Sequence, residues 1–311
     1  MIITHRHPLA QIKQRSIIVL LFAMLTMATH RVVAYMPVTP GQVRFHDMAR
    51  DTARLTQMLT EVEALKLKTP GDRIVAMGER LLGTPYVAHT LEADSEGDPE
   101  RLTVNLDGID CTTFVETVTA LAMTIDEGRT GWRDFLYNLE KLRYRGGEMN
   151  GYASRLHYVC DWIVNNRSKG IITEVTDHMP GVRYAEKTID FMTANRDRYP
   201  ALTDSLTYER VKNTESGYHR HRYPYIRTND TGARKALDIY RNGDILAFTS
   251  SLKNLDVTHM GILVIDPDGT PRVMHASSSL GKVVISDSSL ADFLKRNRSL
   301  TGIRLLRLLE Y

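Results

Sequence analysis

The sequence predicts an α+β fold, with helices in its first part and an antiparallel sheet in its last quarter. Apolar residues recur at three- and four-residue spacing through the first part, as in amphipathic helices. The last quarter has short apolar runs separated by turn sequences such as Asp266-Pro267-Asp268-Gly269, which is typical of strands. Of the 311 residues, 42% are hydrophobic and 25% are charged, so the chain can bury a sizeable core.

The first 34 residues are expected to form a signal peptide. Basic residues precede an apolar run over residues 17–28, and Val32-Val33-Ala34 provides a cleavage site near Ala34. The apolar run is shorter than the roughly 20 residues that span a bilayer. We therefore expect an exported, periplasmic protein with no stable membrane insertion after cleavage. Retention of this segment as an N-terminal anchor is the alternative.

Three helices are predicted before residue 127. An apolar stripe between Phe45 and Val62 indicates a helix that packs on the main body or forms an arm, and we assign residues 35–69 to an N-terminal helical arm. Thr69 and Pro70 are typical of the N-cap and first turn of a second helix. After residues 87–107, which we interpret mostly as a loop, a third apolar stripe predicts a helix whose first turn contains Cys111.

The middle of the chain mixes helices with irregular segments. Basic and aromatic residues alternate over residues 217–225, a pattern that can bind nucleic acid. One short patch on a chain of net charge +3 argues against nucleic acid as a partner, so we interpret this segment as a loop. The periodicity predicts helices over 132–142, from about 157, and over 184–195. It predicts strands over 171–175, 243–248, 259–265, 272–275, 283–286 and 303–309.

Cys111 is a candidate nucleophile because of its place at a helix start. Unpaired N–H groups and the positive end of the helix dipole favour a thiolate there, and a neighbouring imidazole would lower the thiol pKa further. The alternative is that Cys111 is a small buried apolar residue. Cys160 lies in a helical pattern and is interpreted as a packed thiol. A disulfide between the two cysteines would exclude the nucleophile hypothesis.

Two histidines in the strand-rich part are candidates for a base and its partner. His259 precedes the apolar run Met260–Val264, and His275 lies on the next predicted strand. Residues on adjacent antiparallel strands can lie within hydrogen-bond reach. A thiol nucleophile needs a base, and the base needs an orienting group, which predicts these roles for His259 and His275. Taken alone, each histidine would be interpreted as a half-buried polar residue.

Several ordered motifs resemble the NlpC-type cell-wall cysteine peptidases, a compact papain-like superfamily. The resemblance extends from about residue 70 to the C-terminus, so residues 70–311 are expected to form a papain-like catalytic domain with helical insertions. It rests on Gly83-Thr84-Pro85-Tyr86, Asp110-Cys111 followed by Phe114, Gly243–Phe248, His259–Val264 and His275-Ala276.

The resemblance implies a role for each matching residue. Cys111 would be the nucleophile, His259 the general base and later acid, and His275 the group that sets the tautomer of His259. Tyr86 would help to position the substrate carbonyl or oxyanion together with the Cys111 N–H. Asp110 would cap the helix or contact the substrate.

Two further segments resemble a narrower branch, which is N-acetylmuramoyl-L-alanine amidase-like. They are Asp110–Glu116, where Thr112-Thr113 replaces the Ser-Gly of many relatives, and Ser154–Tyr158. This resemblance implies cleavage of the amide between N-acetylmuramic acid and L-alanine in peptidoglycan fragments. Arg155, His157 and Tyr158 would contribute to sugar or peptide recognition, or else form a packed helix start.

Three hypotheses follow for the function. The leading one is an exported amidase that acts on muropeptides through a thioester. The second is an endopeptidase that cleaves the stem peptide between D-glutamate and the diamino acid, and the third is a non-catalytic wall-binding module. No metal or cofactor is expected, because no His, Asp and Glu cluster has ligand spacing and acyl transfer is complete without one. The oligomeric state is left open.

Overall fold

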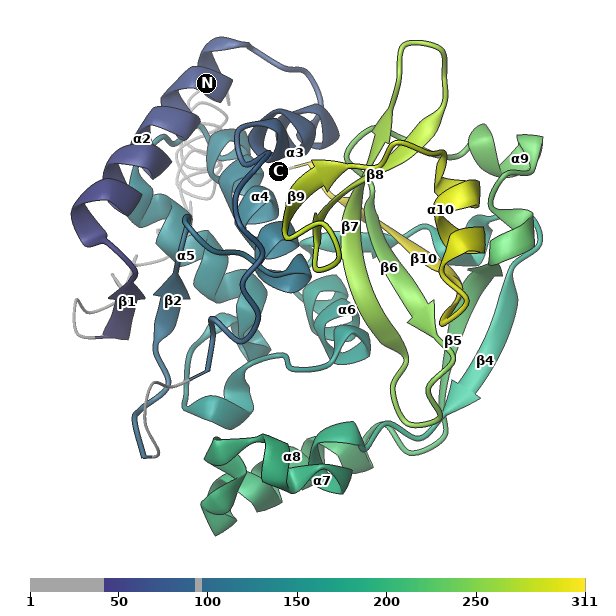
Figure 1. The fold of residues 1–311 in the computed structure, drawn as a ribbon. Coiled ribbons are helices and arrows are strands. Elements are labelled where there is room, and N and C mark those ends of the chain that lie inside the picture. Colours follow the sequence, from purple (N-terminus) through teal and green to yellow (C-terminus); the bar gives the residue numbers. More distant parts are fainter. Residues whose placement is uncertain (1–41, 93–96, 311) are drawn as a thin grey trace, which may run out of the picture. The chain divides into compact units, whose positions relative to one another are not determined.

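The computed structural model describes residues 42–92 and 97–310, which form an α+β architecture as predicted. The expected signal peptide, residues 1–34, lies outside these residues. Figure 1 shows the helices α2 to α5 gathered on one side and the main sheet on the other. Within the described part of the chain, no helix has the length and apolar character needed to cross a membrane.

The helical side is built around α4, which is buried almost all round. A helix that is apolar on every side must be covered by other elements, and α2, α3 and α5 all contact α4. Thr69 caps α3 by accepting a hydrogen bond from the Asp72 N–H at 3.1 Å, with Pro70 in the first turn as predicted. The helices of this side are α2 (Met48–Ala64), α3 (Pro70–Glu79), α4 (Cys111–Asp126), α5 (Trp132–Arg143) and α6 (Val159–Ser168).

The main sheet has eight strands in the order β4-β5-β10-β6-β7-β8-β9, with β3 also paired to β10. Every recorded pair within it is antiparallel. A separate parallel pair, β1 (Val43–Phe45) and β2 (Leu102–Val104), lies beside the helices. The main strands are β3 (Ile172–Glu174), β4 (Arg183–Lys187), β5 (His221–Arg227), β6 (Ile245–Ser250), β7 (Val257–Ile265), β8 (Pro271–Ser277), β9 (Lys282–Ile285) and β10 (Leu300–Leu308).

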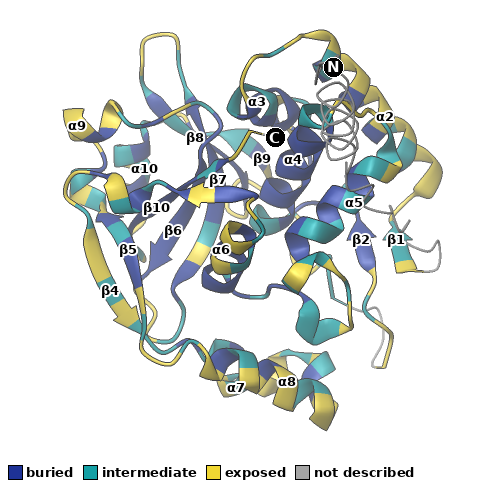
Figure 2. Ribbon diagram, turned by 180° about the vertical axis from the view of Figure 1, so that it is seen from behind, coloured by how far each residue is buried: buried dark blue, intermediate teal, exposed yellow. Residues whose placement is uncertain are grey.

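The two faces of the sheet bury two different cores, because successive strand residues point to opposite faces. On β6, Ile245 and Ala247 belong to the core shared with the helices. Leu246 and Phe248 belong to a second core, which also contains residues of α9 (Arg234–Leu237) and α10 (Leu290–Arg296). Figure 2 shows the central strands buried and the edge strand β4 largely exposed.

Two predictions in the middle of the chain were wrong. Residues 184–195 were expected to be one helix, but they contain β4 and the short helix α7 (Phe191–Ala194). Residues 217–225 were expected to be a loop, but β5 begins at His221 and pairs with both β4 and β10. β4 is exposed on most of its length and therefore lacks the apolar alternation that marks a strand.

The segment between β4 and β5 also contains α8 (Ser205–Ser216) and forms a small core of its own with α6. This core includes Cys160, which is buried and free, as expected for a packed thiol. Cys111 is also free, so no disulfide joins the two cysteines. The disulfide that would have excluded a nucleophilic role is therefore not formed.

Candidate active site

Cys111 is the first residue of α4, and Asp110 fixes its position. The Asp110 Oδ1 atom accepts hydrogen bonds from the backbone N–H of Thr113 at 2.8 Å and from its hydroxyl at 2.9 Å. In return, the Asp110 N–H donates to the Thr113 hydroxyl at 2.9 Å. This reciprocal capping box satisfies two backbone donors at the helix start. Asp110 therefore caps the helix, which is one of the two roles that the sequence suggested for it.

The environment of the Cys111 sulfur raises the thiol pKa instead of lowering it. Burial is the main cause of a pKa of about 11, and the nearby Asp110 carboxylate adds to it. The Met260 backbone and the Thr112 hydroxyl, 4.0 Å from the sulfur, act in the opposite direction and do not compensate. The helix start was expected to favour a thiolate, but the cost of desolvating the charge is larger. The resting thiol is protonated at neutral pH.

His259 and His275 form a hydrogen-bonded pair on the adjacent strands β7 and β8. The Nε2 atom of His259 lies 2.8 Å from the Nδ1 atom of His275, and the rings are perpendicular, at 88°. The Phe248 ring packs against His259, and the Phe293 ring packs against His275. Burial is the main cause that lowers the pKa of His259 to about 3 and that of His275 to about 4, so both rings are neutral at pH 7.

Cys111 and His259 line the same cavity, which has a volume of about 330 Å³. Met260 follows His259 on β7, and its backbone hydrogen-bonds the Cys111 sulfur. In this state the sulfur makes no hydrogen bond to His259, whose ring lies on the far side of β7 with Phe248. Within residues 42–92 and 97–310, no group of three or more His, Cys, Asp or Glu side chains could hold a metal ion. We call the 330 Å³ cavity that Cys111 and His259 line the Cys111 cavity.

Tyr86 lies beside the nucleophile candidate, in the segment that connects α3 to α4. Its backbone pairs with Ile109, just before the helix cap, and its N–H donates to the Gly281 carbonyl at 2.8 Å in the β8–β9 turn. Burial raises the pKa of the Tyr86 phenol, and the charges of Cys111 and Asp110 raise it further.

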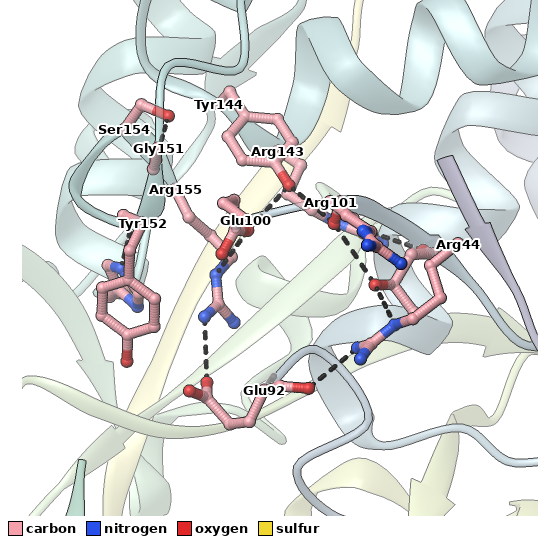
Figure 3. A network of polar contacts seen from close by, with 12 residues as sticks. Arg44, Glu92, Glu100, Arg101, Arg143, Tyr144, Gly151, Tyr152, Ser154 and Arg155 are labelled. Carbon is pink, nitrogen blue, oxygen red and sulfur yellow. Dashed lines mark hydrogen bonds and ion pairs between the residues drawn. The ribbon is translucent and has the colours of Figure 1, made fainter. Parts of the chain in front are cut away.

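The segment Arg155–Tyr158 lines the Cys111 cavity, but its polar groups are largely bound within the protein. Arg155 is buried and pairs with Glu92 at 3.0 Å and with Glu100 at 3.2 Å, as Figure 3 shows. The His157 ring is neutral, because burial holds its pKa well below the usual value, and its Nε2 atom lies 2.8 Å from the Tyr152 carbonyl.

The Tyr158 hydroxyl is likewise hydrogen-bonded within the protein. Its hydroxyl donates to Glu215 at 2.6 Å and accepts from the Met192 N–H at 2.7 Å. These bonds attach α6 to α7 and α8 and so hold the small insertion against the cavity wall. Only the ring of Tyr158 is left to contact a substrate.

The sequence did not identify Glu116 and Arg143, which also line the cavity. Both side chains are 2% exposed and are joined by a 2.7 Å bond, and Arg143 also donates to the Thr103 carbonyl at 2.7 Å. Glu116 is an acidic residue within the apolar stripe of α4, and a buried carboxylate requires a partner. Its position was therefore the one sign in the sequence of a buried ion pair. Its partner on α5 could not be deduced from spacing.

The chain is similar to amidase-like proteins over most of its length. Residues 76–303 match the AmiA-like family model, described as N-acetylmuramoyl-L-alanine amidase-like. The chain belongs to this family. No curated protein matches the sequence.

Solved structures support the same assignment. An N-acetylmuramoyl-L-alanine amidase from Bacteroides uniformis is 37% identical, with a TM-score of 0.71, over 77% of this chain and 99% of that one. A protein from Bacteroides fragilis, named as a xylanase, is 36% identical, with a TM-score of 0.67, over 74% of this chain and 99% of that one. A Legionella pneumophila protein of 21% identity, with a TM-score of 0.64, shares the fold.

Proposed function

We propose that this protein is an exported peptidoglycan amidase, with a papain-like arrangement of the NlpC type. It hydrolyses the amide between N-acetylmuramic acid and L-alanine of muropeptides. The observation that carries the proposal is a thiol at a helix start that shares a cavity with His259, which is hydrogen-bonded to His275. Membership of an amidase-like family and the name of the Bacteroides uniformis protein support it.

In the first half-reaction, the Cys111 sulfur attacks the lactyl carbonyl carbon while its proton passes to His259. Both groups are neutral at rest, so charge separation develops only during the attack. The His259 ring packs against Phe248 and makes no hydrogen bond to the sulfur, so the ring must turn toward Cys111 when the substrate binds. The Cys111 N–H and the Tyr86 phenol stabilise the oxyanion. The carbon–nitrogen bond then breaks, and protonated His259 gives its proton to the leaving amine of L-alanine.

In the second half-reaction, a water molecule hydrolyses the muramyl thioester. Neutral His259 takes a proton from the water as its oxygen attacks the thioester carbonyl, and then returns a proton to the departing sulfur. The products are the free lactyl carboxylic acid and the restored thiol. His275 holds the His259 ring in one tautomer through the 2.8 Å bond and is a positioning residue.

The carboxylates of the Cys111 cavity argue against glycoside hydrolysis, which the name of the Bacteroides fragilis protein would suggest. A glycosidase uses two free carboxyl groups that face each other across the bond to be cut. Here Asp110 caps α4, Glu116 pairs with Arg143, and Glu92 pairs with Arg155. All three have structural partners.

Product analysis tests which bond is cut. Digestion of a defined muropeptide, followed by mass spectrometry, should yield the free sugar acid and an intact peptide that begins with L-alanine. L-alanine that stays on the sugar would instead indicate an endopeptidase. No cleavage, together with retained binding to peptidoglycan, would indicate a wall-binding module.

Export is a separate part of the proposal and rests on residues 1–34. N-terminal sequencing of the protein recovered from the periplasm should show a mature chain that begins just after Ala34. An intact N-terminus in the membrane fraction would indicate a retained anchor instead.

A further inference from the structure

The turn between β6 and β7 is bound by a lysine from another strand. It covers residues 251–256 and leads directly into β7, which carries His259. Figure 1 shows the end of β4 beside this turn. The Lys187 ammonium, at the end of β4, donates to three backbone carbonyl oxygens, those of Ser250 at 2.5 Å, Leu252 at 2.6 Å and Leu255 at 2.9 Å. An ammonium group has three N–H donors, so Lys187 uses all of them at this turn.

The positive charge of Lys187 matters for the shape of the turn. Carbonyl dipoles that converge on one point repel one another unless a cation lies between them. The side chain is partly buried, and burial lowers the pKa of Lys187, while the charge of the Asp256 carboxylate acts in the opposite direction. Removal of the ammonium would leave the three carbonyl groups without this donor and would free the turn to change conformation.

Asp256, the last residue of the turn, is held by the neighbouring strands. Its side chain is fully buried, and its carboxylate lies 3.8 Å from the Arg304 guanidinium on β10. Burial raises the pKa of this carboxyl, while the charges of Arg304 and Lys187 lower it. The Asp256 carbonyl accepts from the Ser250 N–H at 2.7 Å. The turn is therefore fixed by one positive charge from β4 and one from β10.

A β-bulge separates this turn from His259. Phe248 and Thr249 are consecutive on β6, but their partners on β7 are His259 and Val257. Thr258 is therefore an extra residue on β7, and a bulge of this kind redirects the side chain beside it. His259 comes only four positions after the last residue bound to the ammonium. The conformation of the turn therefore determines where the His259 side chain begins.

We propose that Lys187 is a positioning residue for His259. Its ammonium fixes the β6–β7 turn, the turn fixes the bulge at Thr258, and the bulge places the His259 backbone where the ring can turn toward Cys111. Lys187 does not line the Cys111 cavity, so it acts on the reaction through this turn. This inference rests on the proposed amidase function, in which His259 is the base.

Removal of the ammonium, followed by its replacement with a small amine, tests the proposal. Lys187→Ala should lower kcat on a muropeptide by about ten- to a hundredfold, because a small displacement of a catalytic group is costly. n-Propylammonium chloride replaces the deleted carbons and the ammonium group, and it should restore most of the lost kcat. Tetramethylammonium chloride at the same ionic strength has the charge without N–H donors and should restore none. A kcat within twofold of wild type, or a loss confined to KM, would overturn the proposal.

Lys253 offers a matched control, because it lies in the same turn, is exposed and does not line the Cys111 cavity. Lys253→Ala should keep the wild-type kcat and should not respond to propylammonium. If Lys187→Ala does not fold, Lys187→Arg and Lys187→Gln replace it. Lys187→Arg keeps the charge and the donors and should retain a higher kcat than the neutral Lys187→Gln. Equal kcat values in these two variants would show that the charge of Lys187 does not position His259.

NMR of the histidine rings separates this inference from the proposed function. In protein with isotope-labelled histidine, the His259 imidazole signals, assigned from the His259→Gln variant, should shift in Lys187→Ala and return with propylammonium. The signals of the exposed His178 should stay unchanged. Unchanged His259 signals would overturn the positioning role. If wild type cleaves no muropeptide while the His259 signals respond to Lys187→Ala, the proposed function fails and the link between Lys187 and His259 stands.

Discussion

The Nε2 atom of His259 lies 2.8 Å from the Nδ1 atom of His275, on the neighbouring strand. Because both rings are neutral at pH 7, one nitrogen donates and the other accepts, and the pair fixes a tautomer for each ring. If His275 donates, the remaining nitrogen of His259, Nδ1, carries the proton; if His259 donates, Nδ1 is free to accept one. Only the second arrangement allows His259 to act as a base toward the thiol.

His275→Gln should therefore lower kcat by about ten- to a hundredfold, with a small effect on KM, because the base loses its orienting acceptor. Steady-state kinetics on a muropeptide measure this effect. His178→Gln is a suitable control, since His178 is exposed, ends the short 3-10 helix Thr176–His178 and does not line the Cys111 cavity. A kcat within twofold of wild type in His275→Gln would show that His275 does not position the base.

The reactivity of Cys111 toward iodoacetamide should increase steeply with pH. A thiol with a pKa of about 11 is a small fraction thiolate at pH 7, and this fraction rises about tenfold per pH unit up to pH 9. Peptide mapping by mass spectrometry separates Cys111 from the buried Cys160, which should label far more slowly. A labelling rate that is already constant below pH 8 would instead reveal a preformed thiolate–imidazolium pair.

The sequence was sufficient to predict the elements that carry the candidate site. The apolar stripe after Asp110 placed Cys111 at a helix start, and the runs after His259 and before His275 placed the two histidines on neighbouring strands. These patterns are local and depend on periods of 3.6 and 2 residues. The AmiA-like family assignment agrees with the resemblance drawn from the same motifs.

Other features depend on contacts between distant segments and could not be predicted. β5 pairs with β10 across the sheet, although its basic and aromatic residues look like a surface loop. The pairing of Glu116 with Arg143 joins two helices, and no spacing rule selects this partner. The thiol pKa depends on how much water the fold removes from the sulfur, and the helix position alone suggested the opposite direction.

Glu116→Ala should destabilise the protein by about 3–5 kcal/mol, because it leaves the Arg143 guanidinium charged and buried without its partner. The loss is measured by urea unfolding at pH 7. The double variant Glu116→Leu with Arg143→Met should recover much of this stability, since it removes both charges. Similar losses in the single and double variants would show that the ion pair is not the cause.

A lower pH should reduce the free energy of unfolding, because buried histidines that are neutral in the folded state become protonated on unfolding. Burial, followed by the charge of Arg304, lowers the pKa of His221 from 6.5 to about 4. A group whose folded pKa is depressed contributes full stability above its unfolded pKa and loses it as pH falls through the folded value. The stability that depends on His221 is thus present above pH 6.5 and declines between pH 6.5 and 4.

His221→Gln isolates this contribution from those of the other titrating groups. Urea unfolding at pH 7, 5.5 and 4.5 should show that wild type loses more free energy of unfolding over this range than the variant. Parallel curves for the two proteins would contradict a depressed pKa for His221.

Acyl transfer by the Cys111 sulfur, with His259 as its base, requires both side chains. The most direct measurement is the digestion of one defined muropeptide by wild type, Cys111→Ala and His259→Ala, with products identified by mass spectrometry and folding checked by circular dichroism. We predict that wild type releases the muramyl acid and an L-alanine-first peptide, and that both folded variants release neither above background. Full activity in Cys111→Ala would show that Cys111 is not the nucleophile.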